Sequence, residues 1–388
     1  MNEKALSIVF TGDIGFDHYM ARKWEDDGLI SDDVLAFFDS ADHVVANIEG
    51  PLCSLEKQVV KHAVPQLMHV IDPAAETVLK KIHADIWNLD NNHIMDAGEE
   101  GLIRTLQEAE RFGAKTIGAG RNIKEAAEPL FLEEAGGIGI FAVGYRRGCK
   151  PAGENRAGCL LWNDMDLIEE HIKRIKATCR WCIMVAHGGE EFTSLPTPYT
   201  RDRYLSYLDM GADIIVCHHP HVPMNYETFP GKAIFYSLGN FIFDTPYQRA
   251  QFNTEKGLLL RICLTEDGFT FEPFGIEIDR NEEHVIQGKL PAIFEDVPEE
   301  EYRRLVPLAA KMFVAATKRQ QIFLNPDKFT NADEAVWKEH FADPKRSGRV
   351  PGEALDFTIV CPLAEKENEK EWTLSRLDHV VNYILEQM

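Results

Sequence analysis

Six side chains in this chain supply the ligand mixture that a pair of divalent metal ions needs. They are Asp13, Glu49, Asn92, His187, His219 and His221. A two-metal site requires a carboxylate that can bridge the ions, neutral imidazoles, and few enough charges that bound water becomes acidic. Each residue taken singly is better explained as a turn residue or a satisfied polar group. Taken together, they predict a site for two ions of Mn, Fe or Zn.

Short polar strings carry these residues, and each string directly follows an apolar run. The strings span 11–13, 47–49, 91–96, 187–191 and 218–221, and the runs before them span 6–10, 44–46, 86–89, 182–186 and 214–217. If the runs are parallel strands, every string lies at the carboxyl edge of one sheet, where open α/β folds place their sites.

The intervening sequence predicts the elements that would position this site. From about residue 5 to 265, apolar runs alternate with amphipathic stretches, which indicates βα units and a mainly parallel or mixed sheet. Helices are predicted over 98–112, 164–179 and 202–210, and further strands over 138–143, 233–236 and 258–264. We therefore predict an α/β catalytic domain over 1–285, followed by a mostly helical extension over 286–388.

The net charge of -22 argues against nucleic acid as a partner, because such binding depends on Lys and Arg that neutralise phosphates. An anionic substrate would instead be met locally, by the metal ions with Arg146, Arg147, Lys150 and Arg201 as candidate helpers. No apolar run is long enough for a signal peptide or a membrane span, so we expect a cytoplasmic protein without membrane insertion.

The 8 cysteines are expected to be reduced and mostly buried. Cys179 and Cys182 have the spacing of a redox motif, but they straddle a predicted helix end and strand, so a chance match is the favoured interpretation. The sequence offers no second such pair for a structural zinc site.

The same motifs resemble those of the CapA family, the bacterial poly-γ-glutamate capsule synthesis proteins, which is related to the calcineurin-like metallophosphoesterases. The resemblance covers about residues 5 to 250, and its motifs include 47–51, 91–98, 187–192, 219–221 and 236–241. It implies a layered α/β sandwich of the metallophosphoesterase type. This chain departs from the family pattern at Gly188, which is usually aromatic, and at Cys217, which is usually Gly. Gly15 stands where a metal-binding His is usual, so that ligand is missing or is supplied by Asp17 or His18.

The resemblance also implies roles for the site residues. Asp13 and Glu49 would hold the metals, with Glu49 as the bridge, and Asn92 would bind through its side-chain oxygen. His93 would protonate the leaving group, with Asp96 orienting it. Glu191 would act as a general base or would support a ligand. Apart from the resemblance, we expect His218 to be packed away beside His219 and Asn240 to cap a turn rather than bind metal.

Three classes of function stay open on this reasoning. The first is metal-dependent hydrolysis of a phosphoester, or of an amide in a glutamyl polymer or peptide. The second is peptide epimerisation, with His93 and Glu191 as acid and base. The third is a non-catalytic component of polymer synthesis or export. Analogy of fold favours hydrolysis, and a homodimer is compatible with an acidic chain of this size.

Overall fold

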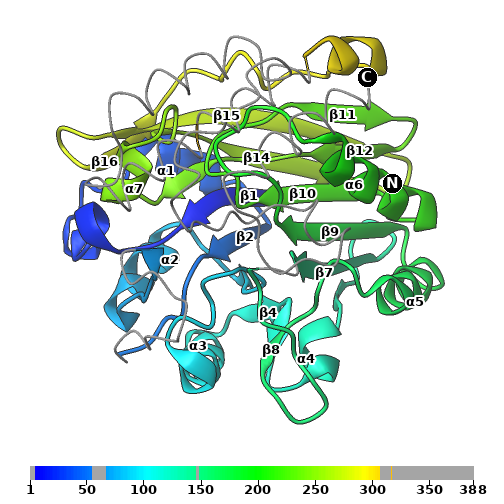
Figure 1. Cartoon of the computed structure of the whole chain (residues 1–388), viewed down its shortest axis with the longest axis horizontal. Helices are drawn as coiled ribbons and strands as arrows, with labels where there is room; N and C mark the ends of the chain where they lie inside the picture. Colours follow the sequence, from blue (N-terminus) through cyan, green and yellow to red (C-terminus); the bar gives the residue numbers. More distant parts are fainter. Residues whose placement is uncertain (1–4, 55–66, 146–147, 306–315, 317–388) are drawn as a thin grey trace, which may run out of the picture.

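The protein folds into a sandwich of two mixed β-sheets (Figure 1). The computed structural model describes residues 5–54, 67–145, 148–305 and 316. The first sheet has 8 strands in the order β16-β15-β14-β1-β2-β3-β4, with β13 paired to β1, and the second has 6 strands in the order β11-β12-β10-β9-β7-β6. The expected α/β class is confirmed. The expectation of one sheet is wrong, because the apolar runs are divided between two.

The first sheet is parallel at one side and antiparallel at the other. Its parallel strands are β1 (Leu6–Ile14), β2 (His43–Ile48), β3 (Ile86–Asn88) and β4 (Lys115–Ile117), and β13 (Asn240–Ile242) pairs in parallel with the end of β1. The antiparallel strands are β14 (Lys256–Leu264), β15 (Phe269–Asp279) and β16 (His284–Gln287).

The second sheet has a parallel centre with antiparallel edges. The central strands are β7 (Ile138–Gly144), β9 (Trp181–His187), β10 (Ile214–His218) and β12 (Lys232–Phe235), and the edge strands are β6 (Leu130–Leu132) and β11 (Tyr226–Phe229). A small sheet of β5 (Ala119–Gly120) and β8 (Gly158–Cys159) lies beside them.

Alternation along the strands fixes which side chains fill the sandwich. In β1, Ile8 and Phe10 join a buried cluster with strand residues of the second sheet such as Ile183 and Val216, whereas Val9 joins the cluster on the helical side. Successive strand side chains point to opposite faces, so a strand buried on both faces is apolar throughout. This explains why the runs in the sequence are continuous rather than alternating.

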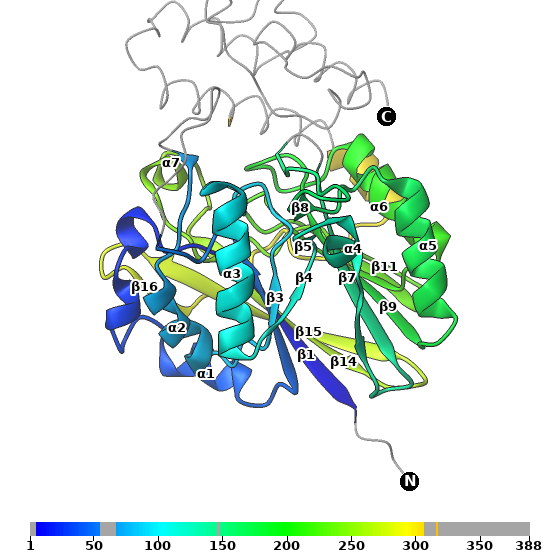
Figure 2. The ribbon, with the colours of Figure 1, turned by 90° about the horizontal axis from the view of Figure 1, so that it is seen from below.

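Helices cover the outer faces of both sheets. Figure 2 shows α1 (Asp32–Phe38), α2 (Glu76–Lys81) and α3 (Gly98–Phe112) on one side, and α5 (Met165–Lys176) and α6 (Pro198–Met210) on the other. The short helices α4 (Ile123–Ala127) and α7 (Pro246–Arg249) lie in connections. In α3 the spacing of Leu102, Leu106 and Ala109 buries one face, and Gly113 ends the helix at φ 90°.

The three helices predicted from the sequence are confirmed, with small differences at their ends. Over the described residues, 7 cysteines are free thiols, of which five are buried. Within the same residues, none of the helices has the length and apolar character needed to cross a membrane. Most of the predicted helical extension over 286–388 lies outside the described residues, which include a helix at 299–305. The predicted domain boundary at 285 falls within β16, and the division into domains stays a prediction.

Candidate metal centre

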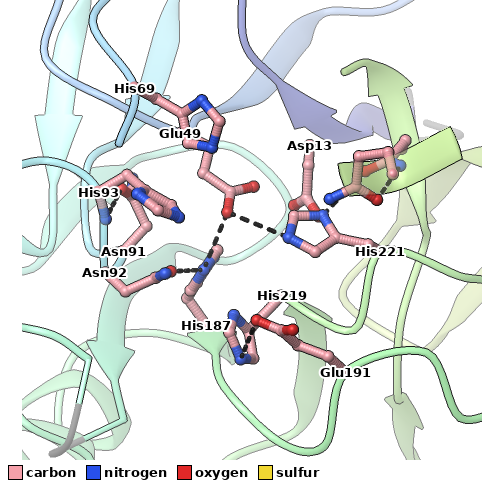
Figure 3. Close-up of polar contacts among 12 residues, drawn as sticks. Asp13, Glu49, His69, Asn91, Asn92, His93, His187, Glu191, His219 and His221 are labelled. Atoms are coloured by element: carbon pink, nitrogen blue, oxygen red, sulfur yellow. Dashed lines mark hydrogen bonds and ion pairs between the residues drawn. The ribbon is translucent and has the colours of Figure 1, made fainter. Parts of the chain in front are cut away.

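Strand ends of both sheets meet at one buried cluster (Figure 3). Asp13 lies near the end of β1, Glu49 directly follows β2, and His187 ends β9. His219 and His221 follow β10. The sequence predicted one sheet edge for these residues, whereas the structure brings them together from the facing carboxyl ends of two sheets.

Glu49 occupies the middle of the cluster. Its Oε1 lies 3.7 Å from His187 Nε2 and 3.6 Å from His221 Nε2. Two ligand groups share Glu49, one with His219 and His221 and one with Asp13 and His187, and the ligand atoms within each group lie within 4.8 Å of one another. A carboxylate common to two ligand groups has the placement expected of a metal bridge.

Several buried atoms of the cluster make no hydrogen bond. They are both carboxylate oxygens of Glu49, Asp13 Oδ2, His187 Nδ1 and His219 Nδ1. A buried polar atom without a partner costs about 1–3 kcal/mol, and a charged one costs more. Divalent cations would satisfy the carboxylate oxygens of Glu49 and Asp13, so these residues fit the metal pair that the sequence predicts.

The electrostatics of the cluster suit a cation as well. Burial, followed by repulsion from Asp13, raises the pKa of Glu49 well above its usual range. Burial and the neighbouring imidazoles hold the pKa values of His187 and His219 well below the usual range, so both rings are neutral, as ligands must be. Burial also opposes the charge on His221, but Glu49 and Asp13 outweigh it and raise the pKa of His221 to about 10, so a metal ion that binds His221 would have to displace a proton.

A relay of amides crosses three neighbouring strands behind Asp13. Asp13 Oδ1 accepts a hydrogen bond of 2.7 Å from Asn47 Nδ2, and Asn47 Oδ1 accepts one of 2.7 Å from Asn88 Nδ2. These bonds fix the orientation of the carboxylate, as supporting bonds do for metal ligands generally. Asn240 supports the site in the same way, since its Oδ1 lies 3.0 Å from His221 Nδ1, and its predicted role as a turn cap gives way to this contact.

The backbone that presents His219 and His221 is in the left-handed region, at φ 99° and φ 58°. Such residues cost of order 1–3 kcal/mol each and concentrate at functional sites. Aromatic packing holds them in place. His221 stacks between Phe243 and Phe192, with ring centroids 4.9 Å and 5.9 Å away, and Tyr145 lies over His219 at 4.5 Å.

The loop after β3 brings Asn92 and His93 to the cluster. Asn92 Oδ1 lies 2.8 Å from His187 Nε2. His93 Nδ1 lies 2.8 Å from Asp96 Oδ2, the pairing that the sequence predicts.

Glu191 reaches the cluster from the loop after β9. Its Oε1 lies 3.8 Å from His219 Nε2, and its Oε2 accepts a hydrogen bond of 3.3 Å from the Tyr247 hydroxyl. Burial raises the pKa of Glu191. The structure thus brings all nine predicted site residues to one place, while their roles stay predictions.

The sequence reasoning missed His69. Its ring lies 4.3 Å from that of His93, and its Nδ1 lies 3.0 Å from Asp17 Oδ2. Burial, followed by the charge of His93, lowers the pKa of His69 to about 4. His69 follows no apolar strand, so the pattern that identified the other residues gave no signal for it.

Other expectations need correction. Asp17 and His18 belong to neither ligand group, because Asp17 instead bonds to His69. Arg201 is engaged by Glu227 and Glu299 at 2.7 Å each, which leaves it poorly suited to assist an anionic substrate. Lys150 is exposed, and residues 146–147 lie outside the described residues.

Two expectations about the surroundings of the cluster can be compared with the structure. His218 is packed away as expected, with Nε2 2.8 Å from the Thr11 carbonyl oxygen. At Gly188, an added Cβ would lie 2.7 Å from Tyr145 Cβ and 2.8 Å from the Trp162 ring. Side chains from elsewhere in the fold therefore fill the space that an aromatic residue at this position would need.

Comparison with known proteins places the cluster in context. Residues 7–245 match the family model described as bacterial capsule synthesis protein PGA_cap. The chain is 30% identical over 271 residues to the PGA biosynthesis protein CapA of Bacillus subtilis, covering 69% of this chain and 70% of that protein. It is 26% identical over 277 residues to the capsule biosynthesis protein CapA of Bacillus anthracis, covering 69% of this chain and 66% of that protein.

Solved structures show weaker likenesses. A hypothetical protein from Thermus thermophilus aligns with a TM-score of 0.45 at 14% identity, covering 70% of this chain and 99% of that one. A novel phosphatase from Mycoplasma pneumoniae aligns with a TM-score of 0.41 at 16% identity, covering 74% of this chain and 92% of that one. Because both scores are low, the description of the fold rests on the strand order itself.

Proposed function

The chain belongs to the PGA_cap family of bacterial capsule synthesis proteins, and from this membership we propose that it is a metal-dependent hydrolase of poly-γ-glutamate metabolism. Its substrate would be a glutamyl amide in a polymer or peptide, or a phosphoester. The names of the Bacillus relatives support the link to the capsule polymer. The observation that supports catalysis is the pair of ligand groups that share the buried Glu49, whose oxygens make no hydrogen bond.

Each side chain has a definite task in this proposal. Asp13, Glu49, Asn92, His187, His219 and His221 would hold two divalent ions. When bound, such ions supply Lewis acidity and lower the pKa of water. Because Asp96 engages Nδ1 of His93, the Nε2 atom of His93 is the one that would give a proton to the leaving group. Glu191, whose pKa is raised by burial, would take up a proton.

Hydrolysis is favoured over the alternatives for a chemical reason. Epimerisation needs an acid and a base on opposite faces of one carbon atom, and it has no need of two adjacent ligand groups. In a scaffold without turnover, buried carboxylate oxygens that make no hydrogen bond would destabilise the fold without contributing to function. The arrangement around Glu49 therefore supports chemistry at activated water.

The first test is the metal content of protein purified without chelator or nickel. We expect the cluster around Glu49 to hold about two equivalents of Mn, Fe or Zn, and an Asp13→Ala, His219→Ala double variant to lose these two equivalents. His93→Ala is the matched control, because it should keep the metal and lose turnover. No bound metal, even with excess ion, would overturn the proposal and leave a non-catalytic component.

The second test identifies the reaction. The metal-loaded protein would be incubated with poly-γ-glutamate, and the length of the polymer would be measured over time. In parallel it would be incubated with phosphomonoesters and phosphodiesters, and the release of phosphate or alcohol would be measured. Cleavage of either class supports hydrolysis and identifies the substrate class. Deuterium uptake from solvent without cleavage would support the epimerase instead. A cytoplasmic location and a homodimeric state stay predictions, which fractionation and size-exclusion chromatography would check.

A further inference from the structure

We propose that Asp90, Cys149 and Cys159 form a second metal site, separate from the cluster around Glu49, which takes a thiophilic divalent cation of the Zn²⁺ type. The carboxylate and the two sulfur atoms lie within 4.8 Å of one another, and all three residues are buried. The observations that support this site do not depend on the proposed hydrolase activity.

The fold assembles these three residues from distant segments. Asp90 follows β3 of the first sheet, Cys149 follows β7 of the second sheet, and Cys159 ends β8 of the small sheet. Cysteines that are close in sequence, such as Cys179 and Cys182, are the usual sequence signature of a zinc site. Asp90, Cys149 and Cys159 lack that signature because they come together only in the folded chain.

The carboxylate of Asp90 is the observation that points to a ligand. Asp90 is 0% exposed, burial raises the pKa of its carboxyl well above the usual range, and its oxygens make only weak contacts, with the Cys149 and Cys159 thiols and the Leu160 amide. Buried carboxylates in proteins are nearly always paired, hydrogen-bonded or bound to a metal. No described cation accounts for Asp90, whereas the neighbouring sulfur atoms are suitable co-ligands.

Gly144 leaves the room that the three ligands need. A Cβ added at this position would lie 2.1 Å from Asp90 Oδ1 and 2.3 Å from Cys149 Sγ. Both ligand atoms therefore occupy the space that the side chain of any residue other than glycine would fill at position 144. Replacing Gly144 with any other residue would separate them.

The donor set suits zinc. Two thiolates and one carboxylate carry three negative charges against the two positive charges of the ion, and Zn²⁺ takes this mixture of ligands. Zinc binding would displace the protons of both thiols, because cysteine binds a metal ion as the thiolate. The Asn91 carbonyl oxygen, 4.0 Å from Cys159 Sγ, or a water molecule would complete a tetrahedron.

The proposed ion would act on the neighbouring cluster through the chain. Asp90 is followed directly by the loop that carries Asn92 and His93. An ion on Asp90 would tie this loop to the ends of β7 and β8, which belong to other sheets. Its role would be to position the loop rather than to contact substrate.

X-ray absorption at the zinc edge tests the proposal directly. The ligands predicted around Glu49 are all oxygen or nitrogen, so a sulfur shell at about 2.3 Å reports only the second site. We expect this shell in the zinc-loaded protein and in the Asp13→Ala, His219→Ala variant, which should retain one sulfur-bound ion. A failure of the hydrolase proposal would leave this signal unchanged.

Variants with matched controls complete the test. Cys149→Ala with Cys159→Ala should lose one equivalent of zinc and the whole sulfur shell. The control variant Cys182→Ala, Cys217→Ala removes two buried thiols from β9 and β10, and it should keep both the equivalent of zinc and the sulfur shell. Bound zinc without sulfur neighbours in the unaltered protein would overturn the proposal, as would a disulfide between Cys149 and Cys159 in the non-reduced protein. The spectrum of the unaltered protein decides the question even if the double variant fails to fold.

Discussion

Replacing Glu49 with Gln should make the metal-free protein more stable at neutral pH, although it removes the residue that both ligand groups share. Glu49 is 0% exposed, and both of its oxygens lack hydrogen bonds. Its pKa is raised by burial and then by Asp13. The folded state therefore binds the proton of Glu49 more tightly than the unfolded state does, and the ionised form opposes folding.

The sign and size of the effect follow from linkage. Because the pKa is raised on folding, the stability attached to this carboxyl is lost as the pH rises from about 4.3 through the raised folded value, at 1.36 kcal/mol for each pKa unit. An unpartnered buried polar group costs about 1–3 kcal/mol, and a charged one costs more. The variant also loses the attraction of His221, 3.6 Å away, which offsets part of the gain. We expect a net increase of about 1–3 kcal/mol at pH 7.5.

Urea unfolding in the presence of chelator, followed by tryptophan fluorescence, would measure this difference. It should shrink as the pH falls toward about 4.3. Adding metal at about 1,000 times its Kd should stabilise the unaltered protein by about 4.1 kcal/mol and the variant hardly at all, so the order of stability reverses.

Glu190 provides the matched control. It is also 0% exposed, but its oxygens accept hydrogen bonds from the Thr197 hydroxyl and amide and from the Thr200 hydroxyl, at 2.7, 3.2 and 3.0 Å. Burial raises the pKa of Glu190 as well, but these hydrogen bonds oppose the shift, so Glu190→Gln should destabilise the protein by at most about 1.5–3 kcal/mol, the value of hydrogen bonds to a charged group. If Glu49→Gln destabilises the metal-free protein as Glu190→Gln does, the view of Glu49 as an unsatisfied charge is wrong.

Three further predictions concern other parts of the structure. Arg201→Ala should lower the free energy of unfolding in urea by about 3–5 kcal/mol, because it leaves the charge of Glu227 buried without a partner cation. The double variant Arg201→Met, Glu227→Met should lose less stability than Arg201→Ala, and an equal loss would contradict this explanation. Gly12→Ala should cost about 1–3 kcal/mol or more, since its Cβ would lie 2.3 Å from the Gly239 carbonyl oxygen; an unchanged unfolding midpoint would contradict this. His93→Ala should lower kcat by about 10²–10⁴-fold at unchanged metal content, and full activity would exclude it as the proton donor.

The sequence predicted the residues of the site better than their surroundings. Asp13, Glu49 and His187 could be found because each ends an apolar run, and parallel strands present their carboxyl ends together. The number of sheets could not be predicted, because continuous apolar runs mark strands buried on both faces without saying what covers each face. His69 lay outside this pattern, and its place beside His93 depends on contacts that the chain makes only when folded.

The cysteines also show what could and could not be predicted from the sequence. Their burial followed from the apolar runs around them, and it is confirmed for Cys182 and Cys217. The approach of Cys149 and Cys159 to Asp90 depends on how the small sheet lies against the larger ones, which no local pattern records.

Because the cluster around Glu49 is built from the ends of two facing sheets, it does not exist in any short fragment of the chain. The hydrogen bond between His218 and Thr11 alone spans 207 positions. A chain emerging from the ribosome would carry Asp13 and Glu49 long before the histidines that follow β10 are made. Metal ions therefore cannot nucleate folding here, and they should bind only after the slow, long-range docking of the sheets is complete. Metal uptake during refolding would then serve as a kinetic reporter for the last stage of assembly.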